Sequence, residues 1–329
     1  MSANSAETHV RGKTVSVPSV QIDGRVIVAL GNWVRTAQVK DEELVEGKIF
    51  EDPALFIARL KASDFKADIF TFAQKPPATT PNYCYPWEWD NWAAIPISSF
   101  KQWWEERLPQ ESRKNVRRAA KRGVIVKAVP FSPELVTGIK GIYDETPIRQ
   151  GKPFWHFGKD FETVKRENET YSERSEFVGA FYNGELIGFI KITFVDRTAT
   201  IMQILSKNAH YDKRPMNAML AHTVELCERK RVSHLIYGQY VYGKKQNSSL
   251  TEFKRRNGFE EIKFPRYFVP LSLNGRLAVA FGLHLGVSNL IPGPVNDFLL
   301  KVRARTCRSW IEQHRSLWKR ISDFVIAFW

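Results

Sequence analysis

The residues that decide the fold of this chain lie between Phe177 and Leu271, and the last predicted helix in that stretch ends in FKRRNGFEE (Phe253–Glu261). The stretch opens with FVGAFYNGELIGFIKITF, in which two apolar, β-branched segments flank Asn183-Gly184. Both residues tolerate positive φ, so the pair predicts a tight hairpin between two strands. The predicted order is strand 177–182, strand 186–194, strand 198–205, a helix from Pro215, strand 234–241, helix 248–256 and strand 261–271.

Upstream of this stretch, the pattern predicts one strand and two helices. Residues 124–129 are mainly β-branched, and Ser132 and Pro133 open a helix that extends to Glu145. A second helix is predicted at 160–171. The connection between the two helices is rich in Gly and Pro and carries Arg149, Trp155 and His156. Loops with such side chains often bind ligands.

Residues 99–122 predict basic connecting helices, interrupted at Pro109 and ended by Gly123. Helical spacing places five cations on one side of the second helix: Arg113, Lys114, Arg117, Arg118 and Lys121. Two interpretations stay open. The cations form either a solvated basic face or a face that binds phosphate or RNA.

Residues 21–98 predict an irregular α/β region. Its elements are expected as strands 26–30, 33–39 and 68–72 and a helix at 53–61, and a proline-rich loop follows at 75–81. Trp87, Trp89 and Trp92 come next, separated by acidic residues and an asparagine. These rings either seal one domain against the next or form a platform on which a ligand stacks.

Composition limits the class of protein and of partner. The chain has 329 residues, 43% hydrophobic and 26% charged, which suffices for one large or two small domains. A net charge of +14 favours anionic partners. Cys84, Cys227 and Cys307 lie far apart, so we expect reduced thiols in a cytoplasmic protein and no metal site. Residues 1–20 lack a signal-peptide pattern and predict a disordered arm.

Residues 123–272 as a whole resemble the GCN5-related N-acyltransferase fold in the order of their elements and in the helix ending FKRRNGFEE. The preceding RKNVRRAAKRGV (113–124) is similar to the RxNxRxAxKxGV motif of Fem-type peptidyltransferases. The resemblance implies a mixed, largely antiparallel α/β sheet flanked by helices. It also implies that residues 21–98 are a degenerate first half of the same kind.

The resemblance implies a donor site between strands 198–205 and 234–241 and at the start of the next helix. The donor would be acyl-CoA such as acetyl-CoA or, as Fem-type enzymes use, aminoacyl-tRNA. The residues matched to donor-binding positions are Gln203, Ile204, Leu205, Lys213, Arg214, Met216, Asn217, Ala218 and Asn247. Met216 stands where the family's phosphate loop has its central glycine, and it would crowd a close backbone approach.

Candidate catalytic residues are Asp144, Glu145, His156, Tyr240 and Lys254. Lys254 stands where the family has an acid tyrosine. A carboxylate or imidazole near the acceptor can remove a proton from an amine before it attacks a carbonyl. Arg149 and Trp155 are expected to bind the acceptor. The competing interpretations are a packed histidine at His156 and a helix end at Asp144 and Glu145.

Residues 273–329 lie beyond the resemblance. The uncharged segment 277–296 is interrupted by Gly and Pro and is too short in its apolar part to span a bilayer. Residues 295–329 predict an amphipathic, basic helix, which either anchors the protein peripherally on an anionic inner membrane face or packs in a domain or dimer contact. The oligomeric state stays open.

Together these patterns predict an acyltransferase that modifies an amine on a small molecule or on a glycan or peptide precursor. The alternative is a non-catalytic protein that binds RNA or a membrane through a degenerate acyltransferase fold.

Overall fold

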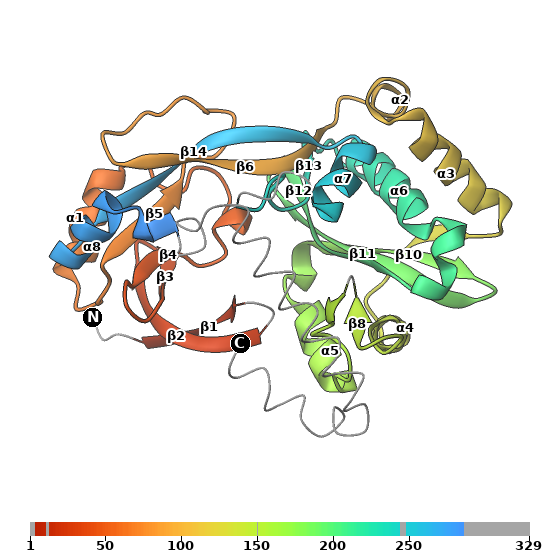
Figure 1. Ribbon diagram of the computed structural model, residues 1–329, viewed down its shortest axis with the longest axis horizontal. Coiled ribbons are helices and arrows are strands. Elements are labelled where there is room, and N and C mark those ends of the chain that lie inside the picture. The colour runs from red at the N-terminus through yellow and green to blue at the C-terminus, as the bar shows by residue number, and fades with distance from the viewer. Residues whose placement is uncertain (1–3, 11–12, 150, 244–247, 286–329) are drawn as a thin grey trace.

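A computed structural model describes residues 4–10, 13–149, 151–243 and 248–285. Within these residues, the sheet has twelve strands in the order β1-β2-β3-β4-β5-β14-β6-β13-β12-β11-β10-β7 (Figure 1). The neighbours β4 and β5 are parallel, as are β12 and β13, and the other pairs are antiparallel. This is the mixed, largely antiparallel sheet that the sequence predicts.

The strands of the large sheet are β1 (Asn4–Val10), β2 (Lys13–Ile22), β3 (Arg25–Leu30), β4 (Thr36–Val39), β5 (Ile69–Ala73), β6 (Trp87–Pro96), β7 (Ile125–Val129), β10 (Ser175–Tyr182), β11 (Glu185–Val195), β12 (Thr198–Ser206), β13 (His234–Ile236) and β14 (Glu260–Pro270). A separate small pair consists of β8 (Ile148–Arg149) and β9 (Lys152–Pro153). The helices are α1 (Pro53–Ala62), α2 (Phe100–Gln102), α3 (Gln110–Lys121), α4 (Pro133–Tyr143), α5 (Phe161–Glu169), α6 (Pro215–Arg229), α7 (Ser249–Arg256) and α8 (Leu273–Ala280). Short turns of helix are η1 (Glu42–Leu44), η2 (Trp103–Arg107), η3 (Ser172–Arg174), η4 (Asn208–Lys213) and η5 (Leu283–Leu285).

The hairpin between β10 and β11 confirms the prediction from Asn183-Gly184. Both residues have positive φ, 50° and 81°, and Tyr182 pairs with Glu185 across the turn. Alternate side chains of β10 enter two different hydrophobic clusters, because successive residues of a strand face opposite sides of a sheet. Val178 packs with α6, and Phe177 packs with α4. The sheet is therefore covered by helices on both faces here (Figure 1).

The ending of α7 shows why the FKRRNGFEE segment needs its glycine. Gly258 has φ of +76°, and the amide of Phe259 donates to the carbonyl of Lys254. A Cβ at Gly258 would lie 2.9 Å from Nε1 of Trp103. The glycine thus ends the helix and lets the chain pass close to the buried indole.

Two long strands, β6 and β14, connect the halves of the sheet (Figure 1). The start of β14 pairs with β6, and its end pairs with β5. The other end of β6 pairs with β13, so β6 lies between β13 and β14. Residues 261–271 were expected to end the acyltransferase-like unit, and β14 does so while also pairing with β5 of the other half. No strand was expected at residues 87–96, whose tryptophans were interpreted as a seal between domains or as a ligand platform, yet these residues form the central strand β6.

The N-terminal half has its own aromatic core, built around Phe50, Phe56, Phe70, Phe72 and Tyr267. Residues 4–10 and 13–22 pair as β1 and β2, and β2 pairs with β3. The disordered arm predicted for residues 1–20 is therefore wrong over these residues. The β-branched Val15, Val17, Val20 and Ile22 favour a strand once β3 is present to pair with it. The predicted boundaries 21–98 and 123–272 between two halves stay predictions.

Two other strands are shorter than expected. β4 begins at Thr36 rather than at residue 33, because Gly31 (φ +100°) turns the chain before it. β13 ends at Ile236, beyond which the chain stays bonded to β6 but no longer pairs with β12.

Asn247 and the helix expected at 295–329 lie outside the described residues. Within the described part of the chain, no helix is long and apolar enough to cross a bilayer.

Candidate functional site

A gap opens in the sheet between β12 and the chain that follows β13. β12 and β13 pair over a short stretch only, in which Thr198 pairs with His234 and Thr200 with Ile236. Beyond this point the backbone of Tyr237 and Gly238 bonds to Ala93 of β6. Residues 201–206 consequently have no strand partner on that side among the described residues. The gap lies where the sequence predicts the donor site.

A bulge shapes β12 beside this gap. The register with β11 shifts so that Ile192 pairs with Ile201 while Lys191 pairs with Gln203, and Met202 is left between them. Of the predicted donor residues on this strand, Ile204 is buried in the core and Leu205 packs on the cluster around α4. The side chains of Ile204 and Leu205 are committed to packing, so these two residues offer a ligand only their backbone groups.

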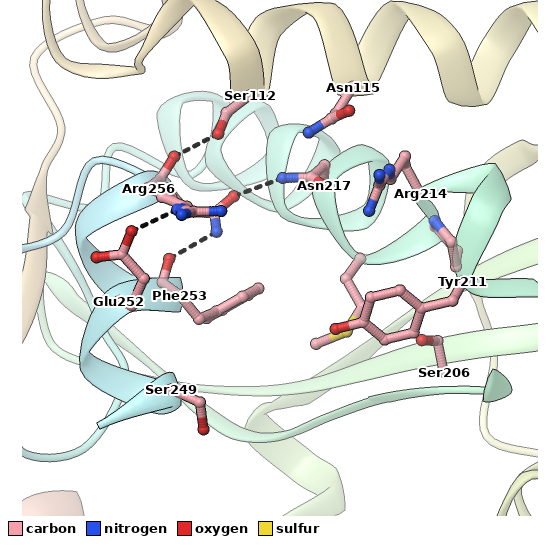
Figure 2. A pocket seen from close by; sticks show the side chains of 13 residues that line it. Ser112, Asn115, Ser206, Tyr211, Arg214, Asn217, Ser249, Glu252, Phe253 and Arg256 are labelled. Carbon is pink, nitrogen blue, oxygen red and sulfur yellow. Dashed lines mark hydrogen bonds and ion pairs between the residues drawn. The ribbon is translucent and has the colours of Figure 1, made fainter. Parts of the chain in front are cut away.

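A cavity of about 220 Å³ lies at the start of α6 (Figure 2). It is lined by Ser112 and Asn115 of α3, Ser206 of β12, Tyr211 and Arg214 before α6, Pro215, Met216 and Asn217 of α6, Ser249, Glu252, Phe253 and Arg256 of α7, and Asn257. Three predicted donor residues, Arg214, Met216 and Asn217, line it. Lys213 and Ala218 do not. Lys213 lies over the ring of Tyr182, and Ala218 packs on the core.

The cavity favours an anion. It includes the first turn of α6, whose amides have no partner within the helix and carry the positive end of the helix dipole. Nε of Arg214 is buried without a hydrogen-bond partner, and the Arg214 side chain has no ion pair among the described residues. Arg256, in contrast, is paired with Glu252 at 2.5 Å. Arg214 is thus the cation of this cavity that has no counter-ion.

Lys254 lies in an aromatic pocket on another side of α7. Its side chain is fully buried, its Nζ donates to the carbonyl of Gln239 at 2.5 Å, and it lies 4.8 Å from each of the ring centroids of Tyr237 and Tyr242. No carboxylate of the described residues is within ion-pair distance. Burial lowers the pKa of Lys254 to about 8.

Tyr240 lies at a second cavity, of about 400 Å³, between β6, the segment after β13 and the start of β14. Trp89, Asp90, Asn91, Val241, Gly243, Thr251, Glu261 and Lys263 also line it. Its wall is largely bonded to itself, because Asp90 accepts from Gln239 and Arg266, and Asn91 bonds to the backbone of Val241. Trp89 is exposed, whereas Trp92 packs on Phe264. Trp92 is thus a packing residue, and the ligand-platform interpretation stays a prediction.

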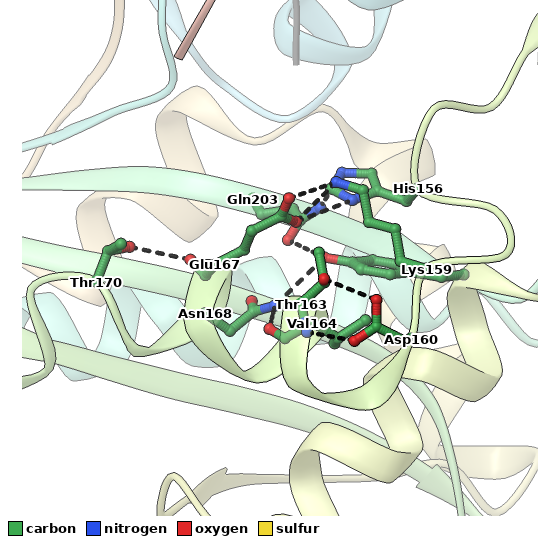
Figure 3. Close-up of polar contacts among 10 residues, drawn as sticks. His156, Lys159, Asp160, Thr163, Val164, Glu167, Asn168, Thr170 and Gln203 are labelled. Carbon is green, nitrogen blue, oxygen red and sulfur yellow. Dashed lines mark hydrogen bonds and ion pairs between the residues drawn. The ribbon is translucent and has the colours of Figure 1, made fainter. Parts of the chain in front are cut away.

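His156 lies buried beside β12 (Figure 3). Its Nε2 is 2.8 Å from Nε2 of Gln203, and Oε1 of Gln203 accepts from the hydroxyl of Tyr143 at 2.8 Å. The rings of Tyr143 and His156 stack at 4.1 Å. Burial, with the charges of Lys159 and Arg149, lowers the pKa of His156 to about 3. The imidazole is therefore neutral at physiological pH, with Nε2 accepting from the amide of Gln203.

Glu145 and Arg149 hold the end of β12. The Glu145 carboxylate accepts from the amides of Asn208 and Ala209 at 2.7 and 2.8 Å. Arg149 donates to the carbonyl of Ser206 at 2.9 Å and pairs with Glu145. These contacts fix the chain between β12 and α6. The catalytic role of Glu145 and the acceptor role of Arg149 stay predictions.

Asp144 and Trp155 occupy the connection after α4. Asp144 accepts from the amide of Gly158 at 3.0 Å and pairs with Lys140. Trp155 is exposed, with Nζ of Lys159 4.5 Å from its ring centroid. Asp144 thus closes the loop that carries Trp155 and His156, and the roles predicted for both residues are untested.

The basic face of α3 is only partly available to a ligand. Arg113 donates to the carbonyls of Trp104 and Glu105, and Arg118 bonds to Asn115. Arg117 lies over the ring of Trp104. Lys114, Arg117 and Lys121 are exposed. Asn115, which belongs to the motif at 113–124, lines the cavity, so the helix contributes to the site through a neutral side chain as well.

Most of the polar cavity lining was not predicted from the sequence: Ser112, Asn115, Ser206, Tyr211, Ser249, Glu252, Arg256 and Asn257. These residues come from segments up to 145 positions apart, and none forms a local pattern. Only Asn115 had a signal, as part of the Fem-type motif. Within the described residues, no group of three or more His, Cys, Asp or Glu could hold a metal ion.

Comparisons with known proteins give a structural result alone. No family model and no curated protein sequence matches the chain. The solved structure of FemX is similar with a TM-score of 0.55 at 12% identity, covering 84% of this chain and 89% of that one. The C-terminal domain of a putative lysylphosphatidylglycerol synthetase from Agrobacterium fabrum has a TM-score of 0.52 at 15% identity, covering 81% and 89%. L-PGS from Bacillus licheniformis has a TM-score of 0.50 at 13% identity, covering 79% and 86%.

These similarities extend over most of this chain and most of each similar structure, so they include both halves of the sheet. The chain has the GCN5-related N-acyltransferase fold in its Fem-like form.

Proposed function

We propose that this protein is an acyltransferase, which moves an acyl or aminoacyl group from an activated, phosphate-bearing donor to an amine. The observation that carries the proposal is the continuity of the gap and the cavity. Ser206, the last residue of β12, lines the cavity at the start of α6. A donor whose acyl end lies along the unpaired edge of β12 would therefore have its phosphates at Arg214 and the first amides of α6.

The same geometry supports catalysis of attack on a carbonyl. The unpaired backbone of residues 201–206 offers fixed amides to the oxyanion that develops on the acyl carbon. Lys254 lines neither cavity, but its ammonium bonds to Gln239 in the segment that borders the gap. With a pKa of about 8, it is the group that we propose exchanges a proton with the leaving group near neutral pH. Burial raises the pKa of the Tyr240 phenol and lowers that of the His156 imidazole, so neither group changes charge at that pH. Gln203 takes the place of a carboxylate.

Two donors fit this chemistry, acyl-CoA and aminoacyl-tRNA, because both carry phosphates at a distance from the activated acyl group. Met216 at the cavity favours aminoacyl-tRNA, since its side chain occupies the place of a glycine that permits close approach of a pyrophosphate. The exposed Lys114 and Lys121 would add contacts to a longer phosphate backbone. The acceptor would be the amine of a small molecule or of a glycan or peptide precursor, and the setting the cytoplasm.

The test is calorimetric titration of the purified chain with acetyl-CoA and, separately, with a mixture of aminoacyl-tRNAs. Arg214→Ala should weaken binding of whichever donor is used. Arg229→Ala, at the other end of α6, is the matched control and should bind as the natural chain does. Met216→Ala should improve binding of acetyl-CoA but not of aminoacyl-tRNA.

Transfer is then measured with the labelled donor and a panel of amines. Product formation that depends on Lys254 supports the proposal. If neither donor binds and none is consumed, the acyltransferase proposal is wrong, and the non-catalytic alternative takes its place.

A further inference from the structure

The outer side of α8 carries an apolar stripe that faces solvent. Leu273, Leu277 and Phe281 are spaced by four residues, so they share one face, and their exposed fractions are 74%, 58% and 69%. Gly275 and Ala278 are buried on the opposite face. A Cβ at Gly275 would lie 1.8 Å from the carbonyl oxygen of Asp68, so this close packing fixes which way the stripe points.

Trp33 projects from a rigid turn that adjoins α8. Its exposed fraction is 94%, the largest among the large hydrophobic side chains of the described residues. The turn is tight, because Gly31 has φ of +100° and a Cβ there would lie 2.3 Å from the carbonyl oxygen of Val34. Val34 packs in one cluster with Ala278 and Val279 of α8.

One aspartate fixes both elements. Oδ2 of Asp68 accepts from the amide of Arg35 at 2.9 Å, and Oδ1 accepts from the hydroxyl of Ser272, the N-cap of α8, at 2.6 Å. The turn and the helix are therefore held in one arrangement. We call Trp33, Leu273, Leu277 and Phe281 the outer apolar face.

Two unpaired cations flank the outer apolar face, whereas the Asp68 carboxylate beside it is hydrogen-bonded to the turn and to α8. Arg35 and Arg276 are both exposed and have no ion pair among the described residues. The chain continues from this end of the molecule into residues 286–329, whose sequence carries seven Lys and Arg, at 301, 303, 305, 308, 315, 319 and 320, against three acidic residues, at 297, 312 and 323. Basic side chains beside apolar ones are attracted to an anionic lipid surface.

We propose that the outer apolar face is a membrane-docking surface, which rests on an anionic bilayer with Trp33 at the level of the headgroups. Tryptophan suits that position, because its ring has an apolar body and a polar N–H. Four large, exposed apolar side chains on two adjoining elements, held together by Asp68, indicate a binding surface rather than scattered surface residues. The surface is distinct from the predicted helix at 295–329 and does not depend on the transfer reaction.

The experiment is vesicle flotation of the full chain, with phosphatidylcholine alone and with phosphatidylglycerol added. The chain should float with the anionic vesicles only. The triple variant Trp33→Ser, Leu277→Ser, Phe281→Ser should lose about tenfold or more in partitioning, since three apolar side chains leave the interface. Ile125→Ser is the control, because Ile125 is exposed on β7 at the opposite edge of the sheet and should bind as the natural chain does.

Trp33→Phe provides a second measurement that keeps the face apolar. Brominated lipids should quench the fluorescence of the natural chain more than that of Trp33→Phe, at equal binding. Three results would overturn the proposal: no flotation with anionic vesicles, equal flotation of the triple variant, or equal quenching of the two chains. A lipid-free dimer that the triple variant abolishes would also overturn it, because the face would then join two copies.

Discussion

The charged side chains near α7 and those near α5 differ in the ion pairs and hydrogen bonds that they make within the protein. Near α7, Arg214 has no ion pair among the described residues, and the Lys254 ammonium bonds to one backbone carbonyl. Near α5, Arg149 is bonded to Glu145 and to Ser206, and His156 is bonded to Gln203. Near α5 both side chains hold parts of the protein, although Nε of Arg149 and Nδ1 of His156 have no hydrogen-bond partner. Near α7, Lys254 is buried, whereas Arg214 lines the cavity and its side chain has no ion pair among the described residues. A cation without a counter-ion at a cavity, rather than the presence of a titratable residue, distinguishes the better candidate site.

The same two regions differ in charge at neutral pH. Burial lowers the pKa of both Lys254 and His156, to about 8 and about 3. Lys254 therefore changes charge near physiological pH, whereas His156 is neutral throughout that range. Each prediction below tests one side of this contrast.

The largest effect should come from Lys254→Met, which keeps the length and apolar character of the side chain and removes its proton. We expect the transfer rate to fall about 10²–10⁴-fold. Single-turnover kinetics with bound donor measures this fall. Lys191→Met is the matched control, because Lys191 is also buried and has a pKa of about 8, but bonds to Asn168 and Thr170. An unchanged rate in Lys254→Met would remove the lysine from the mechanism.

Arg214→Ala and Arg149→Ala should separate binding from stability. Loss of a charged hydrogen bond to phosphate should raise the donor Kd of Arg214→Ala about 10- to 100-fold, with little change in Tm. Arg149→Ala should lower Tm, because Glu145 and the end of β12 lose a partner. Calorimetric binding and thermal unfolding of both variants check this pair of outcomes. If both variants lose donor affinity, or both lose thermal stability, the distinction between the two regions is wrong.

His156→Phe should destabilise the chain by about 1–3 kcal/mol, because the amide of Gln203 loses its partner in a buried place. Urea unfolding gives this value. The imidazole of the natural chain should also show no titration near its usual 6.5 when followed by NMR. A titration there would place His156 in contact with solvent and weaken the distinction from Lys254.

The smallest effect concerns pH and stability. The folded pKa of Lys254 is lowered from 10.5 to about 8, so the unfolded state binds more protons between these values. Stability should therefore rise as pH increases from about 8 toward 10, by up to about 1.4 kcal/mol for each unit of pKa difference. The unfolding free energy of Lys254→Met should rise less over this range than that of the natural chain. If the unfolding free energy rises equally in the variant and in the natural chain, the rise comes from other groups, of which Lys191 is the first candidate.

Local chemistry predicts much of the fold. Asn183-Gly184, Pro215 and Gly258 each fix a turn, a helix start or a helix end through their own backbone preferences, and the structure has these features. The place of β6 could not be predicted. Its partners β13 and β14 lie about 140 residues or more along the chain, and Glu88, Asp90 and Asn91 interrupt its apolar pattern.

The site was predictable only in part. Arg214, Met216 and Asn217 follow from the start of α6, because a helix N-terminus after a strand offers amides to an anion. Ser112, Ser249 and Arg256 reach the cavity through tertiary packing alone. The bonds that commit Glu145 and Arg149 to β12 likewise join residues about 60 positions apart. Their residue types made Glu145 and Arg149 candidates, whereas only their hydrogen bonds and ion pair in the folded chain show that they hold the end of β12.

The shared strand β14 has a consequence for how the chain is made. Neither half of the sheet is complete until residues 260–270 have been synthesised, because β5 and β6 both pair with β14. Until then, each half presents an open edge that can pair with another chain. Separate expression of either half should therefore give aggregation-prone material, and the whole chain should unfold in one cooperative step. We therefore expect a sheet with two distinct halves to fold as one unit, because the strand that joins the halves is synthesised after all their other strands.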